Sequence, residues 1–500
     1  MIPYLSLLTG LPILGAVLAL GCQDREAWAL RIAAGVTLIS LVLCIPMVQG
    51  FDFSSSAFQF KELHEWIPAW NAKYAMGVDG ITLPLIVLTV VTHAVIILTA
   101  RTLVKAQFSK YLAVFLALQG VTIGVFSALD TLLFYCFWEG MLIPMYLCIG
   151  IWGGESRTQA SIKFFLYTFI GSAFLLLSLV YIGLQAGGFS WAAAVKQPLS
   201  LMAQKWLFLG CLFAFAVKVP MWPVHTWLPD AHTEAPAAGS VILAALMLKV
   251  GAYGFFRFCL PILPDASRFF ATPMLVLSLI AIVYIGLVAL SQKDMKRLIA
   301  YSSVAHMGFV TLGCFGVYLI TFNSGEMFAQ MAMEGALMQM VAHAFGSGAM
   351  FLAFGLLYMQ YHTRLIERFG GLAKVMPVFS ACFMVFALTN VGLPGTAGFV
   401  GEFMVILGLF QGHAGVAALA ALTLIISAAY TLWMFRRVFY GPIQHTAVTA
   451  LQDVNGLSLG VLIFLVLMIF ALGLFPEMVL GPAHASSAQL VQMALKSKLI

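Results

Sequence analysis

The sequence predicts an all-α integral membrane protein with about fourteen transmembrane helices, and three observations indicate this fold class. Of the 500 residues, 62% are hydrophobic and only 9% are charged, whereas soluble domains are roughly 25% charged. Apolar runs of about 20 residues, the length at which a helix crosses a bilayer, recur along the whole chain. Most of the basic residues lie in the short segments between these runs. The lipid bilayer is therefore the expected environment of the chain.

The apolar runs are expected to form spans near 3–21, 29–48, 80–100, 111–129, 131–152, 164–185, 206–228, 235–260, 272–290, 299–321, 328–358, 377–411, 414–435 and 457–475. The first run has neither the basic leader nor the small-residue cleavage site of a secretory signal, so we interpret it as a retained helix. The run 377–411 is too long for one straight helix, so it is expected to be tilted or interrupted. The stretch 483–500 is expected to be an amphipathic or loose tail on the surface.

The distribution of basic residues predicts the orientation of the chain. Fifteen lysines and arginines lie in the loops after odd-numbered spans, and eight lie after even-numbered spans or in the tail. Because cytoplasmic loops carry the excess of positive charge, the odd-side loops are expected to face the cytoplasm. Both termini are then expected on the periplasmic side of a bacterial inner membrane.

Four charged side chains are left in the middle of the predicted spans, and they are Glu139, Lys218, Lys249 and Glu402. Each one costs roughly 2.5–3.5 kcal/mol on insertion scales, and more if it faces lipid without a partner. One interpretation is that they form structural ion pairs between helices. Their separation over four spans instead favours a function in transferring ions or protons.

Histidines accompany these charges, and an imidazole can both give and take a proton near neutral pH. His225, His306 and His343 are candidate relay groups, although each could equally be a satisfied core residue. We interpret His93 as a core residue. Asp130 and Glu155 lie at the ends of spans, where a solvated charge is ordinary.

Helix-breaking residues occur beside two of the four charges. Lys218 is followed by Pro220, which has no N–H to bond the carbonyl of Ala216, and the run "GLPGTAGF" precedes Glu402. Backbone groups freed in this way are tolerated at membrane depth only where they line a watery cavity or are buried in protein. The two breaks are therefore expected where water and a proton path reach the charged groups.

The two breaks occupy matching places in the chain. If the spans within 111–260 and those within 272–435 form two sets of five, the broken span is the fourth in each set. Such paired interruptions are typical of internal repeats in transporters. Two consecutive units with an odd number of spans must face opposite ways, so we expect inverted repeats. The expected divisions are 1–110 for the first three helices, 111–260 and 261–440 for the two repeats, and 441–500 for the last helix and tail.

The chain contains no motif for a redox or nucleotide cofactor. It has no dinucleotide or P-loop fingerprint, no histidine pair typical of haem and no cysteine set typical of an iron–sulfur cluster. The eight cysteines are scattered and read as small core hydrophobes. The net charge of +6 does not indicate a nucleic-acid partner, since the basic residues lie in short loops. Energy is therefore expected to come from another subunit, and the transported species to be protons or sodium.

Four segments of the chain resemble the antiporter-like subunits of respiratory complex I, and they cover most of 111–440. These segments are "KVPMWPVHTWLPDAHTEAPAAGSVILAALMLKVGAYGFFRF", "KDMKRLIAYSSVAHMGF", "EGALMQMVAHAFGSGAMF" and "GLPGTAGFVGEF". The family's fold has fourteen helices with two inverted five-helix units, which agrees with the expectation above. An acid at Glu402, where sister subunits more often carry lysine, and the lack of a long C-terminal extension indicate one subunit type within the family.

The resemblance implies roles for the buried residues. Lys218 would be the central proton-loading lysine with Glu139 as its partner, and Glu402 would be the terminal group. Lys249, with His306 or His343, would carry the proton along the membrane mid-plane. The resemblance also implies neighbouring antiporter-like subunits as partners. It places NADH, FMN, iron–sulfur clusters and quinone in other subunits, with no cofactor in this chain.

Three alternative functions are compatible with the same residues. A related sodium/proton antiporter complex uses similar subunits, but it prefers lysine at the position of Glu402 and needs no redox partner. A membrane subunit of a hydrogenase complex is a second alternative. A bundle that only scaffolds a redox enzyme would keep the hydrophobic pattern, but it should tolerate neutral residues at all four buried charges.

Overall fold

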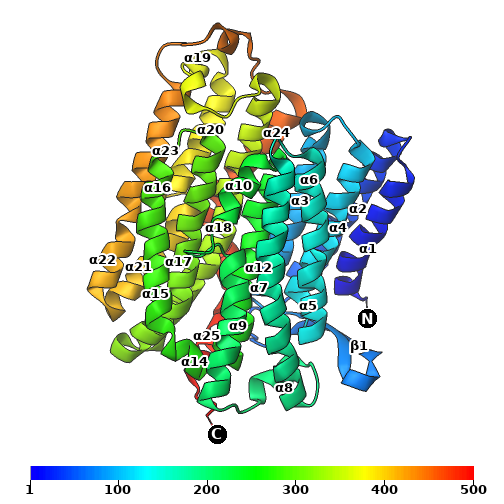
Figure 1. The fold of residues 1–500 in the computed structure, drawn as a ribbon, viewed down its shortest axis with the longest axis vertical. Coiled ribbons are helices and arrows are strands. Elements are labelled where there is room, and N and C mark those ends of the chain that lie inside the picture. Colours follow the sequence, from blue (N-terminus) through cyan, green and yellow to red (C-terminus); the bar gives the residue numbers. More distant parts are fainter. Residues whose placement is uncertain (1, 500) are drawn as a thin grey trace.

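The computed structural model describes residues 2–499, and nearly all of its helices run along the long axis of one bundle (Figure 1). Thirteen helices of the described residues are long and apolar enough to cross a membrane. Two shorter apolar helices, α20 (Pro377–Val391) and α21 (Ala397–Gly412), together make a further crossing. The fourteen predicted spans are thereby confirmed. Both termini lie at the same end of the bundle in Figure 1, as an even number of crossings requires.

A small β-hairpin, which the sequence analysis did not predict, lies between the second and third of the first three helices, at the end of the bundle (Figure 1). The helices are α1 (Tyr4–Gly21), α2 (Glu26–Gln49) and α3 (Thr82–Leu103), and the antiparallel strands β1 (Gln59–Ile67) and β2 (Ala72–Val78) are joined by the 3-10 turn η1 (Pro68–Trp70). Glu62 of β1 accepts hydrogen bonds from the backbone N–H groups of Leu5 (2.8 Å) and Ser6 (3.1 Å). The hairpin therefore supplies the cap that the first turn of α1 lacks.

The crossing that follows α4 (Phe108–Ser127) is interrupted near its middle, where α5 (Thr131–Gly140) ends and α6 (Leu142–Trp152) begins. The helices α7 (Arg157–Ala186) and α8 (Trp191–Lys196) come next. Pro144 cannot donate to the carbonyl of Gly140, and α5 ends at that glycine. Asp130 caps α5 and also accepts from the backbone of Lys73 at 2.9 Å. It is only 1% exposed, so the expectation of a solvated charge at Asp130 is wrong, whereas Glu155 is exposed as expected.

The first predicted break is present where the prolines follow Lys218. The helix α9 (Leu201–Lys218) ends at the lysine, residues 219–226 are not helical, and α10 (Trp227–Glu234) resumes the crossing. The indole N–H of Trp227 donates to the freed carbonyl of Val217 at 2.8 Å. This bond shows how the break is tolerated inside the bundle, because a buried backbone carbonyl without a helical partner finds a side-chain donor.

The helix that carries Lys249 is the most enclosed of the first set. It consists of α11 (Ala237–Ile242), η2 (Leu243–Met247), α12 (Leu248–Gly254), η3 (Phe255–Cys259) and α13 (Leu260–Ile262), and its spanning window is entirely buried. The segments η2 and η3 are π-helical turns that flank α12 on both sides. Such turns are rare and occur frequently at functional sites.

The second set of crossings repeats the long buried helices and the break. It comprises α14 (Pro264–Phe269), α15 (Ala271–Leu279), the π turn η4 (Ile280–Ile285), α16 (Gly286–Leu290), α17 (Met295–Ser324), α18 (Glu326–Tyr361), the 3-10 turn η5 (Ile366–Arg368), α19 (Leu372–Val375), α20, α21, α22 (Ala414–Ala421) and α23 (Thr423–Phe439). Between α20 and α21 the chain turns at Gly392 and Gly395, with φ of +79° and +91°. Glycine is the residue that adopts such angles without strain. The expected interruption of 377–411 is therefore confirmed.

The C-terminal segment is a docked helix. After the 3-10 turn η6 (Thr446–Ala450) and α24 (Gly456–Leu474), the helix α25 (Glu477–Leu495) begins earlier than the expected tail. Its Ser486 hydroxyl accepts from the backbone N–H of Gly80 at 3.0 Å. A Cβ atom on Gly80 would collide with the carbonyl oxygen of Pro482. The amphipathic interpretation is confirmed, and the helix packs closely on the bundle.

Candidate functional site

Lys218 lies at the first break and is 3% exposed. Its Nζ donates to the carbonyl oxygen of Trp138 at 3.3 Å and lies 3.8 Å from the centre of the Trp138 ring. A cation over an indole face is stabilised by the negative charge of that face. Glu139 follows Trp138 in α5 and is half-buried. The structure thus brings Lys218 to the backbone beside its predicted partner, but within residues 2–499 no ion pair joins the two side chains.

Gly251 allows α12 to lie directly against the end of α9. A Cβ atom on this glycine would lie 2.9 Å from the Cβ of Lys218 and 2.9 Å from the backbone nitrogen of Val219. Both contacts are shorter than packed atoms normally tolerate, so a larger residue would push the helices apart. Gly251 follows Lys249 by two residues in α12. This close approach positions the helix of Lys249 beside the break that holds Lys218.

Lys249 contacts the second set of helices directly. It is 0% exposed, and its Nζ lies 2.6 Å from Nδ1 of His343 in α18. The ammonium also donates to the carbonyl of Ala244, within the π turn η2. A charged lysine can only donate hydrogen bonds, so His343 accepts at Nδ1 and carries its own proton on Nε2. A direct hydrogen bond therefore joins Lys249 of the first helix set to His343 of the second.

His306 and Glu402 form a second buried pair. Nδ1 of His306 lies 2.7 Å from Oε1 of Glu402, which is 1% exposed and also accepts from the side-chain amide of Gln339 at 3.0 Å. On the other side of the ring, Nε2 lies 3.0 Å from Oδ1 of Asn390. Glu402 follows the break between α20 and α21, so the break brings the carboxylate and Asn390 to the same imidazole.

A small cavity separates the two pairs. The ring centres of His306 and His343 are 5.8 Å apart. The cavity between their helices measures about 10 Å³, and Gln339 and Ser347 also line it. That is about the space a single water molecule needs, and its polar lining would supply the hydrogen bonds. The four residues Lys249, His343, His306 and Glu402 therefore form one chain of titratable groups, with one gap of water size.

His225 lies apart from this chain. It is in the non-helical segment 219–226, is 8% exposed, and faces the ring of Tyr301 at 6.4 Å between centres. Among the described residues, no hydrogen bond joins it to Lys218 or to the other predicted groups. His93 is buried in α3 with Nδ1 2.8 Å from the carbonyl of Thr89, as expected for a core residue.

Sequence reasoning missed the neutral side chains that hold the site. Trp138 supplies the carbonyl and the ring face for Lys218, Gln339 bonds Glu402, and Asn390 bonds His306. His232 was also missed, although it is fully buried and stacks on Phe351 with 4.4 Å between ring centres. The available signals were positional. Gln339 precedes His343 by four residues, one helical turn, in α18, and Asn390 lies just before the second break.

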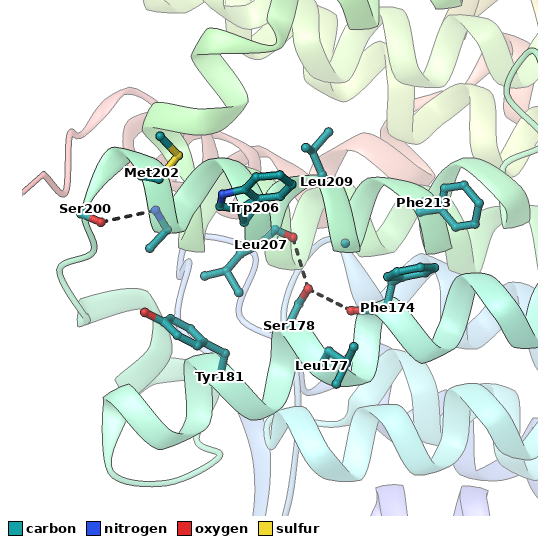
Figure 2. A pocket seen from close by; sticks show the side chains of 12 residues that line it. Phe174, Leu177, Ser178, Tyr181, Ser200, Met202, Trp206, Leu207, Leu209 and Phe213 are labelled. Carbon is teal, nitrogen blue, oxygen red and sulfur yellow. Dashed lines mark hydrogen bonds between the residues drawn. The ribbon is translucent and has the colours of Figure 1, made fainter.

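A large apolar groove lies apart from this chain of groups. It has a volume of about 740 Å³ and lies between α7 and α9, where Phe174, Leu177 and Trp206 line it (Figure 2). Among residues 2–499, Tyr181 is the only titratable side chain that lines it. Its wall is otherwise almost entirely apolar, so it offers no route for a charge.

The chain is similar to known membrane proteins over nearly its whole length. Residues 128–427 match the family described as NADH:quinone oxidoreductase/Mrp antiporter, transmembrane. NADH-quinone oxidoreductase subunit M of Rhodobacter capsulatus is 43% identical, over 98% of this chain and 96% of the relative. A chain of respiratory complex I from Thermus thermophilus, solved with bound NADH, superposes with a TM-score of 0.86 at 30% identity, over 98% of this chain and 99% of that one. A chain of the Mrp complex from a Dietzia species superposes with a TM-score of 0.85 at 19% identity, over 99% and 100%, which shows a shared fold alone. The chain therefore belongs to the family of NADH:quinone oxidoreductase and Mrp antiporter membrane subunits.

Proposed function

We propose that this chain translocates protons as a membrane subunit of NADH-quinone oxidoreductase. The observation that carries the proposal is the buried chain from Lys249 through His343 and His306 to Glu402. Lys249 and His343 are hydrogen-bonded at 2.6 Å, and His306 and Glu402 at 2.7 Å. Ionisable groups inside a membrane bundle are costly and typically mark ion pathways and proton relays. The redox chemistry, with NADH, FMN, iron–sulfur clusters and quinone, is assigned to other subunits of the complex.

The proposed transfer begins at the ammonium of Lys249. Its proton moves to Nδ1 of His343 along the 2.6 Å hydrogen bond, and His343 releases the proton that it carries on Nε2. A water molecule in the cavity of about 10 Å³ would pass the proton toward His306 and Glu402. Lys218 lies beside the helix of Lys249 and reloads it, while Glu139 modulates how firmly Lys218 holds its own proton. His225 has a less direct place in the relay, because it lies outside the hydrogen-bonded chain.

We also propose that 111–260 and 261–440 are two inverted five-helix units, flanked by the helices in 1–110 and the last helix and tail in 441–500. The breaks support this, since each falls in the fourth of five crossings. The common end of both termini and the excess of basic residues in odd-side loops support a periplasmic position for both termini in the bacterial inner membrane. The proposed neighbours are other membrane subunits of the complex, antiporter-like subunits above all.

The identity to subunit M favours the respiratory function over a sodium/proton antiporter. It is 43% over nearly the full chain, whereas the Mrp chain shares 19% and only the fold. The acid at Glu402 also favours the respiratory interpretation. The scaffold alternative makes a different prediction, because a merely structural bundle should pump normally with neutral residues at the buried positions.

The test is coupled proton pumping by the whole complex in sealed vesicles, with assembly checked on native gels. Lys218→Ala and Glu139→Ala are expected to assemble and to lose most proton pumping. Lys374→Ala is the matched control, since Lys374 is exposed in α19 and should be silent. Normal pumping by an assembled Lys218→Ala complex would overturn the proposed function.

A further inference from the structure

Asn390 joins three helices around His306. It is 4% exposed and lies just before the second break, at the end of α20. Its Oδ1 lies 3.0 Å from Nε2 of His306 in α17, and its amide nitrogen donates to the hydroxyl of Thr431 in α23 at 2.9 Å. The hydroxyl of Ser302 contacts the same Oδ1 at 3.4 Å. In this arrangement the amide oxygen of Asn390 faces the imidazole, and the amide nitrogen faces Thr431.

An amide oxygen can only accept a hydrogen bond, so Nε2 of His306 must carry a proton. Its other nitrogen, Nδ1, faces Oε1 of Glu402, which can accept a proton or return one. The hydrogen bond at one ring nitrogen sets the protonation of the other, as in many catalytic and metal-bound histidines. The two nitrogens of His306 are therefore not equivalent in this site.

We propose that Asn390 is a positioning residue that holds the Nε2 proton of His306 and so makes Nδ1 the nitrogen that exchanges protons with Glu402. This inference rests on the proposed function and deepens it. His306 then does not pass a proton through its ring from one nitrogen to the other. It takes up and releases the proton at Nδ1, on the side where Gln339 also lies, with its amide nitrogen 3.4 Å from Nδ1.

The surroundings of His306 fit these different roles of Nε2 and Nδ1. The titratable groups that face it are Glu402 from α21 and His343 from α18, with Tyr430 from α23 beyond Asn390. Among the described residues, none of these groups makes a hydrogen bond to Nε2. That nitrogen is left to the neutral amide, whereas Nδ1 faces the carboxylate. A proton that arrives from His343 can therefore reach the exchanging nitrogen without displacing Asn390.

Two variants separate positioning from simple packing. Asn390→Leu keeps the approximate size and removes the acceptor, so His306 is free to adopt either tautomer. Asn390→Asp keeps the shape and adds a charged acceptor, which strengthens the hold on the Nε2 proton and favours the imidazolium. Coupled pumping is measured against pH in vesicles that contain the whole complex, with Ser380→Ala on the same helix as the control, because its hydroxyl bonds only the carbonyl of Met376.

We expect the alkaline limb of the pumping profile to move to lower pH in Asn390→Leu and to higher pH in Asn390→Asp, by about one pH unit each. A merely structural role would lower pumping in both variants without moving the limb in opposite directions. In infrared spectra of the complex with isotope-labelled histidine, the Nε2-protonated signature of one neutral imidazole should give way to a mixture of tautomers in Asn390→Leu and to an imidazolium signature in Asn390→Asp. Unchanged profiles and spectra in both variants would overturn the inference.

The failure of this inference can be told apart from the failure of the proposed function. Glu402→Gln and His306→Ala are measured in the same vesicles. If both of them pump normally, the proton route itself is wrong. If they lose pumping while the Asn390 variants keep the wild-type profile, the route stands and only the role of Asn390 is refuted.

Discussion

Lys249→Met is the sharpest test of the contact between the two helix sets. Methionine fills nearly the same volume, but it has no group that can bind a proton. The change leaves Nδ1 of His343 and the carbonyl of Ala244 without their donor, which costs about 1–3 kcal/mol for each buried acceptor. It also removes a buried cation, whose desolvation costs several kcal/mol. These effects on folding oppose each other, so the complex is expected to assemble.

Pumping is expected to respond quite differently from assembly. The route loses the group that delivers a proton across the 2.6 Å contact with His343. We expect coupled proton translocation to fall by roughly 10²-fold or more, the contribution typical of a positioned proton-transfer group. The assay follows proton uptake by sealed vesicles during NADH oxidation, with assembly checked on native gels.

Lys249→Arg distinguishes the effect of the buried positive charge from the effect of proton transfer. Arginine keeps the cation and its hydrogen bonds, but it does not release a proton in proteins. It should therefore fail like methionine, although the local charge is unchanged. Wild-type pumping in either assembled variant would refute the reasoning, because the contact between Lys249 and His343 would then carry no proton.

Lys218→Arg is expected to lose most pumping for the same reason, and normal proton uptake would contradict this. Glu402→Gln should lose most coupled quinone reduction and Glu402→Lys should keep a measurable part, since lysine can titrate and glutamine cannot; equal activity of glutamine and glutamate would refute it. In α25, burial lowers the pKa of His484, but hydrogen bonds and charge from Glu334 and Glu477 outweigh burial and raise it. The folded-state pKa lies above the ordinary value of 6.5, so docking of α25 is strongest below that pH and weakens as the pH rises through the raised pKa. Because the His484 side chain is 46% exposed, the effect is expected to stay below about 1 kcal/mol. Hydrogen exchange of α25 measures it, with His484→Gln as the variant that should lose the pH dependence.

The sequence predicts those features that depend on local chemistry. Hydropathy located the spans because each must fill the thickness of the bilayer with apolar residues. Pro220 and Gly392 marked the two breaks because proline removes a donor and glycine permits a positive φ. The β-hairpin between α2 and α3 was missed, since β1 is largely exposed and neither strand shows a clear alternation of apolar and polar residues.

The partners of the buried charges depend on tertiary packing, so the sequence could not specify them. Lys218 meets the carbonyl and ring of Trp138, although Glu139 is the next residue and the obvious ionic partner. Asp130 is buried because the hairpin adds a backbone donor from Lys73 to its helix cap. Asn390 and Gln339 are neutral amides, and their places in the sequence indicate that they lie near the site but not which group each one bonds.

The four mid-membrane charges balance, and this balance explains why the terminal group can be an acid. Lys218 and Lys249 contribute two positive charges, and Glu139 and Glu402 contribute two negative charges when all are ionised. When a proton passes from Lys249 to Glu402, both groups become neutral, so two costly buried charges disappear together. Glu402→Lys would raise the sum by two positive charges. A proton that arrives there would then add a buried cation instead of removing an anion. The variant can still titrate, but each transfer becomes less favourable, so its residual pumping should be well below that of the wild type.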